Sequence, residues 1–331
     1  MNEKSDTLYH PPAKLMRIEL SSVCNYRCHF CCWQNNDRPL PSARFIRFTR
    51  KQIMLFCREL VKSGCRNVNI TGGEPLLLPP DYLFEMIASI NEVEGINKLW
   101  VTTNGVMLRN PDLCRGLAEA GLKEAVVSIA AETDERYSDY TGSALKLSEL
   151  LQGITNAVHA GIAVRVHIPL SPLGIHSFEQ LEVLLDKVMN VGVTEVFYFR
   201  LHNSEKIEEK FSELFVDPLV ITDGFKRSNR WHYRETEHGR PFYTDGFMQV
   251  NVPREEVRLV TQNCKSRNCG MFCQGIYSAY CVPGKDGWIL RACHRIFADK
   301  NNEFPLDMEL LEQGNLQELL RTVWMYAYEN E

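Results

Sequence analysis

The sequence predicts an α/β fold, a partial (β/α)6 TIM-like barrel followed by a smaller C-terminal cysteine-rich domain. Six apolar, β-branched stretches alternate with helical patterns over residues 1–202. Each connection is long enough for a crossover helix, so the strands should be parallel. Polar or glycine-rich motifs follow five of these stretches, at the strand ends where such barrels carry their chemistry. We therefore take residues 1–202 as the barrel and residues 203–331 as the second domain.

The individual elements follow from apolar periodicity and from glycine positions. The expected strands lie at 15–20, 67–70, 98–103, 124–130, 163–170 and 195–201. The expected helices lie at 49–63, 80–92, 111–120, 143–160 and 177–191. Glycine stands at 64, 121, 161 and 192, just before strands, where it commonly ends a helix. Beyond residue 202 we expect a polar region without clear period to 250, a turn and strand in "DGWILRAC" (286–293), and a closing helix at 307–326.

Composition limits the class of protein. The chain has 331 residues, of which 44% are hydrophobic and 24% charged, with a net charge of −5. These values suit an ordinary globular protein and give no overall field that would attract nucleic acid or an anionic membrane. No apolar run could span a bilayer, and the N-terminus lacks the apolar core of a signal peptide. We therefore expect a cytoplasmic protein, whose twelve cysteines indicate metal binding before disulfides.

The stretch "CNYRCHFC" (24–31) is the strongest chemical signal. Thiolates are the usual ligands of iron–sulfur clusters, and three of them leave one iron of a cubane free for another ligand. A structural zinc site is the first alternative, although zinc usually takes four ligands in two separated pairs. Buried thiols without a metal are the second. The spacing favours a cluster held by Cys24, Cys28 and Cys31.

This C-x3-C-x2-C spacing, with Phe30 before the last cysteine, resembles the signature of the radical S-adenosylmethionine (radical SAM) superfamily. "TGGEP" (71–75) resembles the GGE motif of that superfamily, although Gly-Gly-Glu-Pro alone also suits a plain turn. "VTTNGVML", "VVSIAAET" and "TEVFYFRLHN" are similar in order and spacing to the MoaA-like group, the GTP 3′,8-cyclases and their relatives. The resemblance extends over nearly the whole chain.

The resemblance implies a partial barrel in which SAM chelates the free iron of a [4Fe–4S] cluster. Reduction would cleave SAM to methionine and a 5′-deoxyadenosyl radical, which abstracts hydrogen from the substrate. Glycine at the GGE motif would allow close backbone approach, and the glutamate would pair with the amino group of SAM. The residues that the resemblance assigns to SAM are Phe30, Gly72, Gly73, Glu74, Thr103, Asn104, Ser128 and His167.

Substrate contacts are expected from arginines. Arg17 matches an arginine that faces the nucleotide in the cyclases, and Arg165 falls among polar contacts to SAM or substrate. A surface or ion-paired arginine is the alternative for each. Arg230, Arg234 and Arg240 lie in a stretch rich in arginine, histidine and aromatic residues that could bind an anion, or form a solvated loop.

Five cysteines in the second domain resemble an auxiliary-cluster domain. The candidate ligands are Cys269, Cys273 and Cys293, then Cys264 and Cys281. "DGWILRAC" matches a strand that ends in a ligand there, and the implied cofactor is a second [4Fe–4S] cluster, with zinc as the alternative. The spacing departs from the C-x2-C-x13-C of the cyclases, and the printed sequence ends "MYAYENE" where the cyclases carry a Gly-Gly tail.

We therefore expect a radical SAM enzyme of the lyase or oxidoreductase type that acts on a small polar substrate, such as a nucleotide or sugar derivative. Decarboxylation, dehydrogenation or rearrangement in natural-product synthesis would fit. GTP cyclisation, peptide modification and a non-catalytic cluster or zinc protein are the alternatives. A flavodoxin or ferredoxin is the expected reductant, because the potentials of such clusters are low.

Overall fold

The computed structural model describes residues 13–28, 31, 47–200, 215–237, 240–252, 278–292 and 301–326. The expected strands and helices of the barrel are all present. In chain order the elements are β1 (Leu15–Ser21), α1 (Arg50–Lys62), β2 (Asn67–Gly72), η1 (Pro75–Leu77), α2 (Pro80–Asn91), β3 (Lys98–Thr103), η2 (Val106–Arg109), α3 (Pro111–Glu119), β4 (Glu124–Ser128), α4 (Asp134–Thr141), α5 (Leu147–His159), β5 (Ala163–Leu170), α6 (Phe178–Met189) and β6 (Glu195–Arg200). After them come α8 (Pro218–Arg227), β7 (His232–Glu235), β8 (Pro241–Thr244), β9 (Gln249–Asn251), β10 (Ser278–Pro283), β11 (Trp288–Arg291), β12 (Phe304–Pro305), α9 (Met308–Glu312) and α10 (Gln317–Tyr326).

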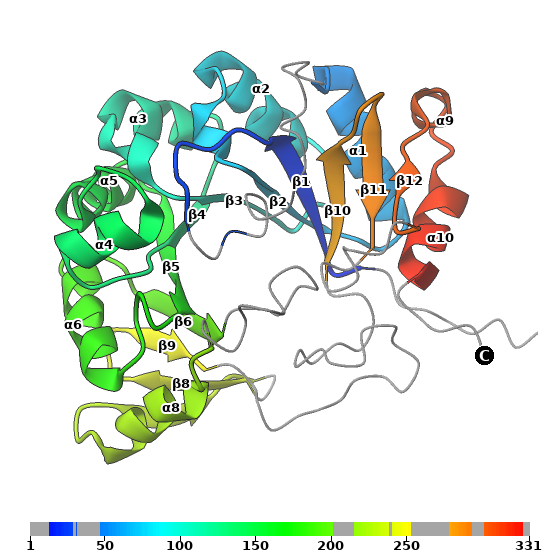
Figure 1. Ribbon diagram of the computed structural model, residues 1–331. Helices are drawn as coiled ribbons and strands as arrows, with labels where there is room; N and C mark the ends of the chain where they lie inside the picture. Colours follow the sequence, from blue (N-terminus) through cyan, green and yellow to red (C-terminus); the bar gives the residue numbers. More distant parts are fainter. Residues whose placement is uncertain are drawn as a thin grey trace, which may run out of the picture.

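The described strands form one sheet in the order β12-β11-β10-β1-β2-β3-β4-β5-β6-β9-β8-β7. The six strands β1 to β6 are parallel neighbours in sequence order, and helices connect them. Figure 1 shows these strands curving around an open centre with the helices on the outside. The sheet does not close, because β12 and β7 are its two edges. The predicted α/β fold with a partial barrel is therefore confirmed.

The later part of the chain extends this sheet at both edges. β10 pairs with β1 in parallel, and β9 pairs with β6 in parallel (Figure 1). The described strands after residue 214 thus belong to the same sheet as β1 to β6. The division of the chain at residue 202 stays a prediction.

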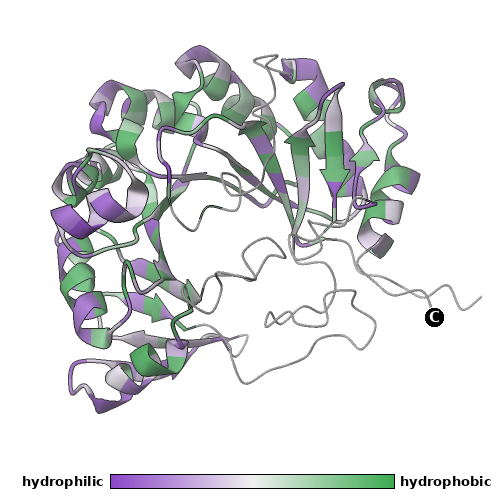
Figure 2. Ribbon diagram, viewed as in Figure 1, coloured by the Kyte–Doolittle hydropathy of each residue, from purple (hydrophilic) through white to green (hydrophobic). Residues whose placement is uncertain are grey.

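Burial alternates along the strands and separates two faces of the sheet. In β5, Val164, Val166 and Ile168 are buried, whereas Arg165 and His167 between them are partly exposed. Because successive side chains of a strand point to opposite faces, one face packs against the helices and the other lines the open centre. Figure 2 shows hydrophobic colour on the strands and the inner helix surfaces and hydrophilic colour on the outer helix surfaces. The concave face is therefore available for polar side chains.

The positions at which helices end agree with the sequence prediction in the barrel and differ from it near the C-terminus. Gly64 and Gly161 have φ of 90° and 86°, as expected of glycines that end helices. The closing helix is instead two helices, α9 and α10, separated at Gly314 with φ of 68°. The helices α4 and α8 and the strands β7 to β10 and β12 were not predicted from the sequence. Within the described residues, no helix combines the length and apolar character needed to cross a membrane.

Candidate active site

The cysteine loop follows β1 directly. Cys24, Cys28 and Cys31 are partly exposed cysteines that form no disulfide. The backbone N–H of Cys31 donates to the Cys28 carbonyl at 3.0 Å, and the N–H of Tyr26 donates to Cys24 Sγ at 3.4 Å. Burial, and then the neighbouring thiols, raise the pKa of Cys28, and burial also raises the pKa of Cys24. The three sulfurs thus lie within electrostatic reach of one another, where a bound cationic group would favour their thiolate forms.

Helix α4 holds this loop from the side. The hydroxyl groups of Tyr26 and Tyr137 are 3.0 Å apart, and both side chains are buried. The backbone N–H of Arg27 donates to the carbonyl of Thr141 at 2.9 Å. Gly142 ends α4 with φ of 58° and lies against Arg27. Two separate hydrogen bonds therefore fix the middle of the cysteine motif to an element that the sequence analysis missed.

Gly72 and Gly73 let the end of β2 approach the cysteine loop. The N–H of Gly73 donates to the Ser21 carbonyl and the N–H of Glu74 donates to the Val23 carbonyl, both at 2.7 Å. A Cβ at Gly73 would lie 2.6 Å from the carbonyl carbon of Val23, closer than real side chains come. The glycines were expected to allow close backbone approach, and the approach in this structure is to the segment that leads into Cys24.

Glu74 is a buried carboxylate at the centre of the strand ends. Its Oε1 accepts from Thr103 Oγ1 at 2.7 Å and from the Leu76 N–H at 2.9 Å, and its Oε2 accepts from the Asn104 N–H at 2.7 Å. Burial raises the pKa of Glu74 to about 7, although these hydrogen bonds oppose the rise. Three residues assigned to SAM by resemblance are thus in direct contact, and Glu74 also lies within electrostatic reach of Cys24.

The concave face below these strand ends carries His167 on β5 beside two aromatic rings of β6. His167 lies 5.6 Å from Phe197 and 6.0 Å from Phe199, measured between ring centroids. Burial, then the nearby charges of Arg165 and Arg17, lower the pKa of His167 to about 3. His167 is therefore neutral at physiological pH. Ser128, at the end of β4, is in register with His167. Phe197 and Phe199 on β6 were not among the contacts expected from the sequence. The sequence signal for them was their spacing of two residues in "EVFYFR", which places both side chains on the same face of the strand.

The two barrel arginines already have partners. Arg17 Nη1 donates to Asn69 Oδ1 at 3.2 Å, and its guanidinium lies 5.9 Å from the ring centre of Tyr280. Arg165 is hydrogen-bonded to Glu124 and lies 3.9 Å from Glu195. Arg165 thus fits the ion-paired alternative, whereas Arg17 meets only neutral groups in these contacts.

Arg230, Arg234 and Arg240 do not join the site. Arg230 pairs with Asp186 of α6 at 2.6 Å and with Asp245 at 3.1 Å, on the helical side of the sheet. Arg234 lies on the exposed strand β7, the edge of the sheet, and Arg240 is an exposed residue next to β8. The structure does not bring these three residues near the cysteine loop, and their expected role in binding an anion stays a prediction.

The other cysteines fall into two groups. Cys264, Cys269, Cys273 and Cys293 lie outside the described residues, as does Phe30, which was assigned to SAM. Cys281 is fully buried on β10 in register with Ile18, on the face that packs against α1, and burial raises its pKa. This position favours a packing role for Cys281. Cys57, Cys65 and Cys114 are fully buried, as expected of thiols without a metal.

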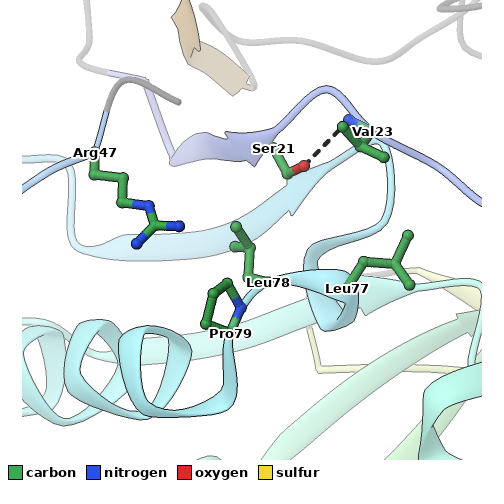
Figure 3. A pocket seen from close by; sticks show the side chains of 6 residues that line it. All are labelled: Ser21, Val23, Arg47, Leu77, Leu78 and Pro79. Atoms are coloured by element: carbon green, nitrogen blue, oxygen red, sulfur yellow. Dashed lines mark hydrogen bonds between the residues drawn. The ribbon is translucent and has the colours of Figure 1, made fainter. Parts of the chain in front are cut away.

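A cavity of about 260 Å³ lies beside the cysteine loop (Figure 3). Its lining comes from the end of β1, the segment around η1 and the residue three positions before α1: Ser21, Val23, Arg47, Leu77, Leu78 and Pro79. Ser21 Oγ accepts from the Val23 N–H at 3.1 Å, which shapes the chain at this wall. The cavity therefore shares its wall with the segment that Gly73 supports.

The donor set fits an iron–sulfur cluster. Three cysteine thiols lie on one short loop. The Tyr26 N–H donates to Cys24 Sγ, and the Tyr26 hydroxyl is hydrogen-bonded to Tyr137, so the middle of the loop is held in place. Among the residues that the structure describes, no group of three His, Cys, Asp or Glu side chains is placed to hold a single metal ion. Thiolate is the ligand that iron–sulfur clusters use, so the chemistry of this donor set suits such a cluster.

Comparisons with known proteins agree with this geometry. The family model described as the radical SAM superfamily matches residues 18–188, about half of the chain. A GTP 3′,8-cyclase of Aquifex aeolicus is 34% identical over 186 residues, which are 55% of each chain. A GTP 3′,8-cyclase of Staphylococcus carnosus is 29% identical over 251 residues, 70% of each chain. The matched region spans about half to two thirds of the length of most of these relatives.

Solved structures show the same fold. The crystal structure of Streptococcus suis SuiB bound to S-adenosylmethionine superposes with a TM-score of 0.59 at 13% identity. The superposition covers 95% of this chain and 64% of SuiB, and at this identity it supports the fold alone. The family match, the relatives and the fold agree with the cysteine loop and the Gly-Gly-Glu turn. The chain belongs to the radical SAM superfamily, and within it to the MoaA-like group.

Proposed function

We propose that Cys24, Cys28 and Cys31 hold a [4Fe–4S] cluster and that SAM lies along the strand ends beside Glu74. When bound, the cluster supplies the electron that cleaves SAM to methionine and a 5′-deoxyadenosyl radical, which abstracts hydrogen from the substrate. The chain itself binds and orients the reactants and keeps water away from the reacting carbon. Membership of the superfamily supports the chemistry.

The observation that carries this proposal is the contact between three strand ends at one rim. Glu74 joins the end of β2 to the end of β3 through Thr103 and Asn104, and Gly73 joins β2 to the segment before Cys24. The thiol loop and a buried carboxylate are thereby fixed over the concave face. An amino group of SAM would give this carboxylate a cationic partner, which is consistent with the expected role of Glu74.

The concave face supports a small polar substrate. His167, Phe197 and Phe199 offer one neutral imidazole and two rings, which suit a base or a sugar ring. The charge of Arg165 is offset by Glu124 and Glu195. Arg17, whose charge also acts on His167, has only neutral groups in the contacts described above. A triphosphate needs concentrated positive charge, so one arginine without an acidic partner in these contacts favours a nucleoside or sugar derivative of low charge over GTP.

Two other substrates have specific support. GTP is favoured by the names of the relatives from Aquifex aeolicus and Staphylococcus carnosus, which are GTP 3′,8-cyclases. A peptide is favoured by the fold likeness to SuiB, which was crystallised bound to its precursor peptide SuiA. For the small polar substrate, we propose decarboxylation, dehydrogenation or rearrangement, with a flavodoxin or ferredoxin as reductant.

The test is 5′-deoxyadenosine formation by anaerobically reconstituted, reduced protein with SAM, measured alone, with GTP, and with a panel of nucleosides and sugar nucleotides. We expect a slow basal rate that GTP leaves unchanged and that one panel member raises at least about tenfold. Omission of the reductant is the control. A faster rate with GTP together with a cyclised nucleotide would establish a cyclase and overturn the preference for low charge.

We also propose a second cluster, with Cys269, Cys273 and Cys293 as the first candidates for its ligands, then Cys264 and, although its position favours packing, Cys281. Support comes from the end of β11, two residues before Cys293. There the buried Asn302 accepts the Ala292 N–H at 2.8 Å, so the chain entering Cys293 is firmly held. Replacing Cys293 by Ala should lower the iron content by about half while SAM cleavage persists, whereas unchanged iron would exclude Cys293 as a ligand.

A further inference from the structure

The side chain of Asn104 lies between the end of β3 and the cysteine loop. Its Oδ1 accepts from the Val106 N–H at 3.1 Å. Its Nδ2 lies 2.7 Å from Asn25 Oδ1 and 3.9 Å from Cys24 Sγ. Because the oxygen is held by an N–H donor and Asn25 presents an oxygen, turning the amide over would break both contacts. The N–H groups therefore face Cys24.

The backbone around Asn104 is held firmly in place. The Asn104 N–H donates to Glu74 Oε2 at 2.7 Å, and the Gly105 N–H donates to Thr103 Oγ1 at 2.9 Å. Gly105 has φ of 80°, and a Cβ there would lie 2.9 Å from Cγ1 of Val127 and overlap Leu150. The turn after β3 is thus restricted to glycine, and the amide cannot move away from the sulfur without rearrangement of this turn.

Cys24 Sγ receives N–H groups from two directions, from the backbone of Tyr26 at 3.4 Å and from the side chain of Asn104 at 3.9 Å. Reduction of an iron–sulfur cluster adds negative charge that is shared with the ligand sulfurs. N–H groups that point at a ligand sulfur stabilise this charge, and such hydrogen bonds are among the factors that set cluster potentials. The Asn104 amide is therefore placed to favour the reduced state.

We propose that Asn104 is a positioning residue that raises the reduction potential of the cluster through its N–H···S contact with Cys24. This inference rests on the proposed function, because it requires Cys24 to be a cluster ligand. It assigns the Asn104 side chain to the cluster, whereas the family resemblance assigned the residue to SAM. Electron transfer from the reductant into the cluster is the step that this contact favours.

The test is an EPR-monitored redox titration of the reconstituted protein without SAM, using Asn104→Ser. Serine keeps a side-chain oxygen that can accept the Val106 N–H. It removes the amide N–H groups that face the sulfur. We expect the stabilisation of the reduced state to fall about three- to tenfold, a shift of about 30 to 60 mV to more negative potential. An unchanged potential in a variant with full iron content would overturn the proposal.

A matched control separates this effect from loss of structure. Asn156 Nδ2 donates to the carbonyls of Leu108 and Arg109 and so supports η2, the helix that follows the same turn. Asn156→Ala should lower stability and leave the potential unchanged. An equal shift in both variants would contradict the proposal.

Two further variants remove the remaining ambiguity. If Asn104→Ser takes up no cluster, Asn104→Asp keeps the side-chain shape and the acceptor for Val106 while it places a carboxylate at the sulfur. Its potential should be more negative than that of the wild type, and an equal or higher value would overturn the proposal. If Cys24→Ala loads as much iron as the wild type, the proposed function fails at its ligand assignment, which is a separate result from an unchanged potential in the Asn104 variants.

Discussion

At the scale of single residues, His167 couples the concave face to pH. Its pKa is lowered from 6.5 to about 3 by burial and by the charges of Arg165 and Arg17. Between these two pH values the unfolded chain binds a proton at this histidine and the folded chain does not. Folding stability should therefore fall as the pH falls below 6.5, by about 1.4 kcal/mol per pH unit from this residue.

The variant that tests this pH dependence is His167→Gln. Its control is His232→Gln on the exposed strand β7. Urea unfolding at pH 6.5 and pH 5 should show that the wild type loses about 2 kcal/mol more than His167→Gln over this interval. The His232 variant should follow the wild type. Equal losses in all three proteins would show that His167 is protonated as readily in the folded state as in the unfolded state.

Gly73 tests whether close approach of two backbones holds the cysteine loop. Its added Cβ would overlap the Val23 carbonyl group, so Gly73→Ala must push the loop away from β2. We expect a loss of about 1–3 kcal/mol in unfolding free energy and a clear drop in iron uptake on reconstitution. Gly287→Ala is the matched control, because a Cβ there meets nothing within 4 Å. Full iron uptake by the Gly73 variant would count against the proposed support.

At the scale of elements, α4 is the link between the barrel wall and the cysteine motif. Replacing Tyr137 by Phe removes the hydrogen bond to Tyr26 and leaves the ring packing in place. The expected cost is about 1 kcal/mol of unfolding free energy, with slower cluster uptake because the loop is less constrained. Tyr233→Phe on the exposed strand β7 is the control and should change neither quantity. Normal uptake by the Tyr137 variant would show that α4 packs against the loop without organising it.

The sequence predicted most barrel elements because their signals are local and strong. β5 is a run of branched residues that begins after Gly161, and α6 begins at a capping box formed by Ser177 and Gln180. α4 was missed because "DERYSDYT" contains few apolar residues. Its signals were Thr133, which caps the helix, the acidic first turn and Gly142 at its end. Its stability comes from burying Tyr137 and Tyr140 against distant residues, which local periodicity does not reveal.

The candidate site was predictable to a similar extent. Motif spacing identified the three thiols and Gly72-Gly73-Glu74, because these residues follow strand ends at one rim. It did not reveal that Glu74 accepts hydrogen bonds from Thr103 and Asn104, since the register of β2 and β3 determines that contact. Nor did it distinguish Arg17 from Arg165, because the difference lies in cross-strand neighbours such as Glu124 and Glu195.

At the scale of the whole molecule, the open sheet brings the chemistry of the family to one rim over a concave face of mixed polarity. The strands β10 and β9, which flank β1 and β6, come from the later part of the chain, so both outer strands of the six-stranded barrel pair with residues after 214. The thiol loop, the buried carboxylate and the aromatic face are thereby held in one body. SAM cleavage should therefore depend on the thiols of the loop and not on the thiols of the core.

The most direct measurement is 5′-deoxyadenosine formation from SAM by the reconstituted, reduced wild type, Cys28→Ala and Cys65→Ala. Cys28 belongs to the proposed cluster, whereas Cys65 is a fully buried thiol of the core. We expect that the wild type and Cys65→Ala cleave SAM and that Cys28→Ala does not. Retained cleavage by Cys28→Ala at the wild-type rate would contradict the ligand assignment on which the proposed mechanism depends.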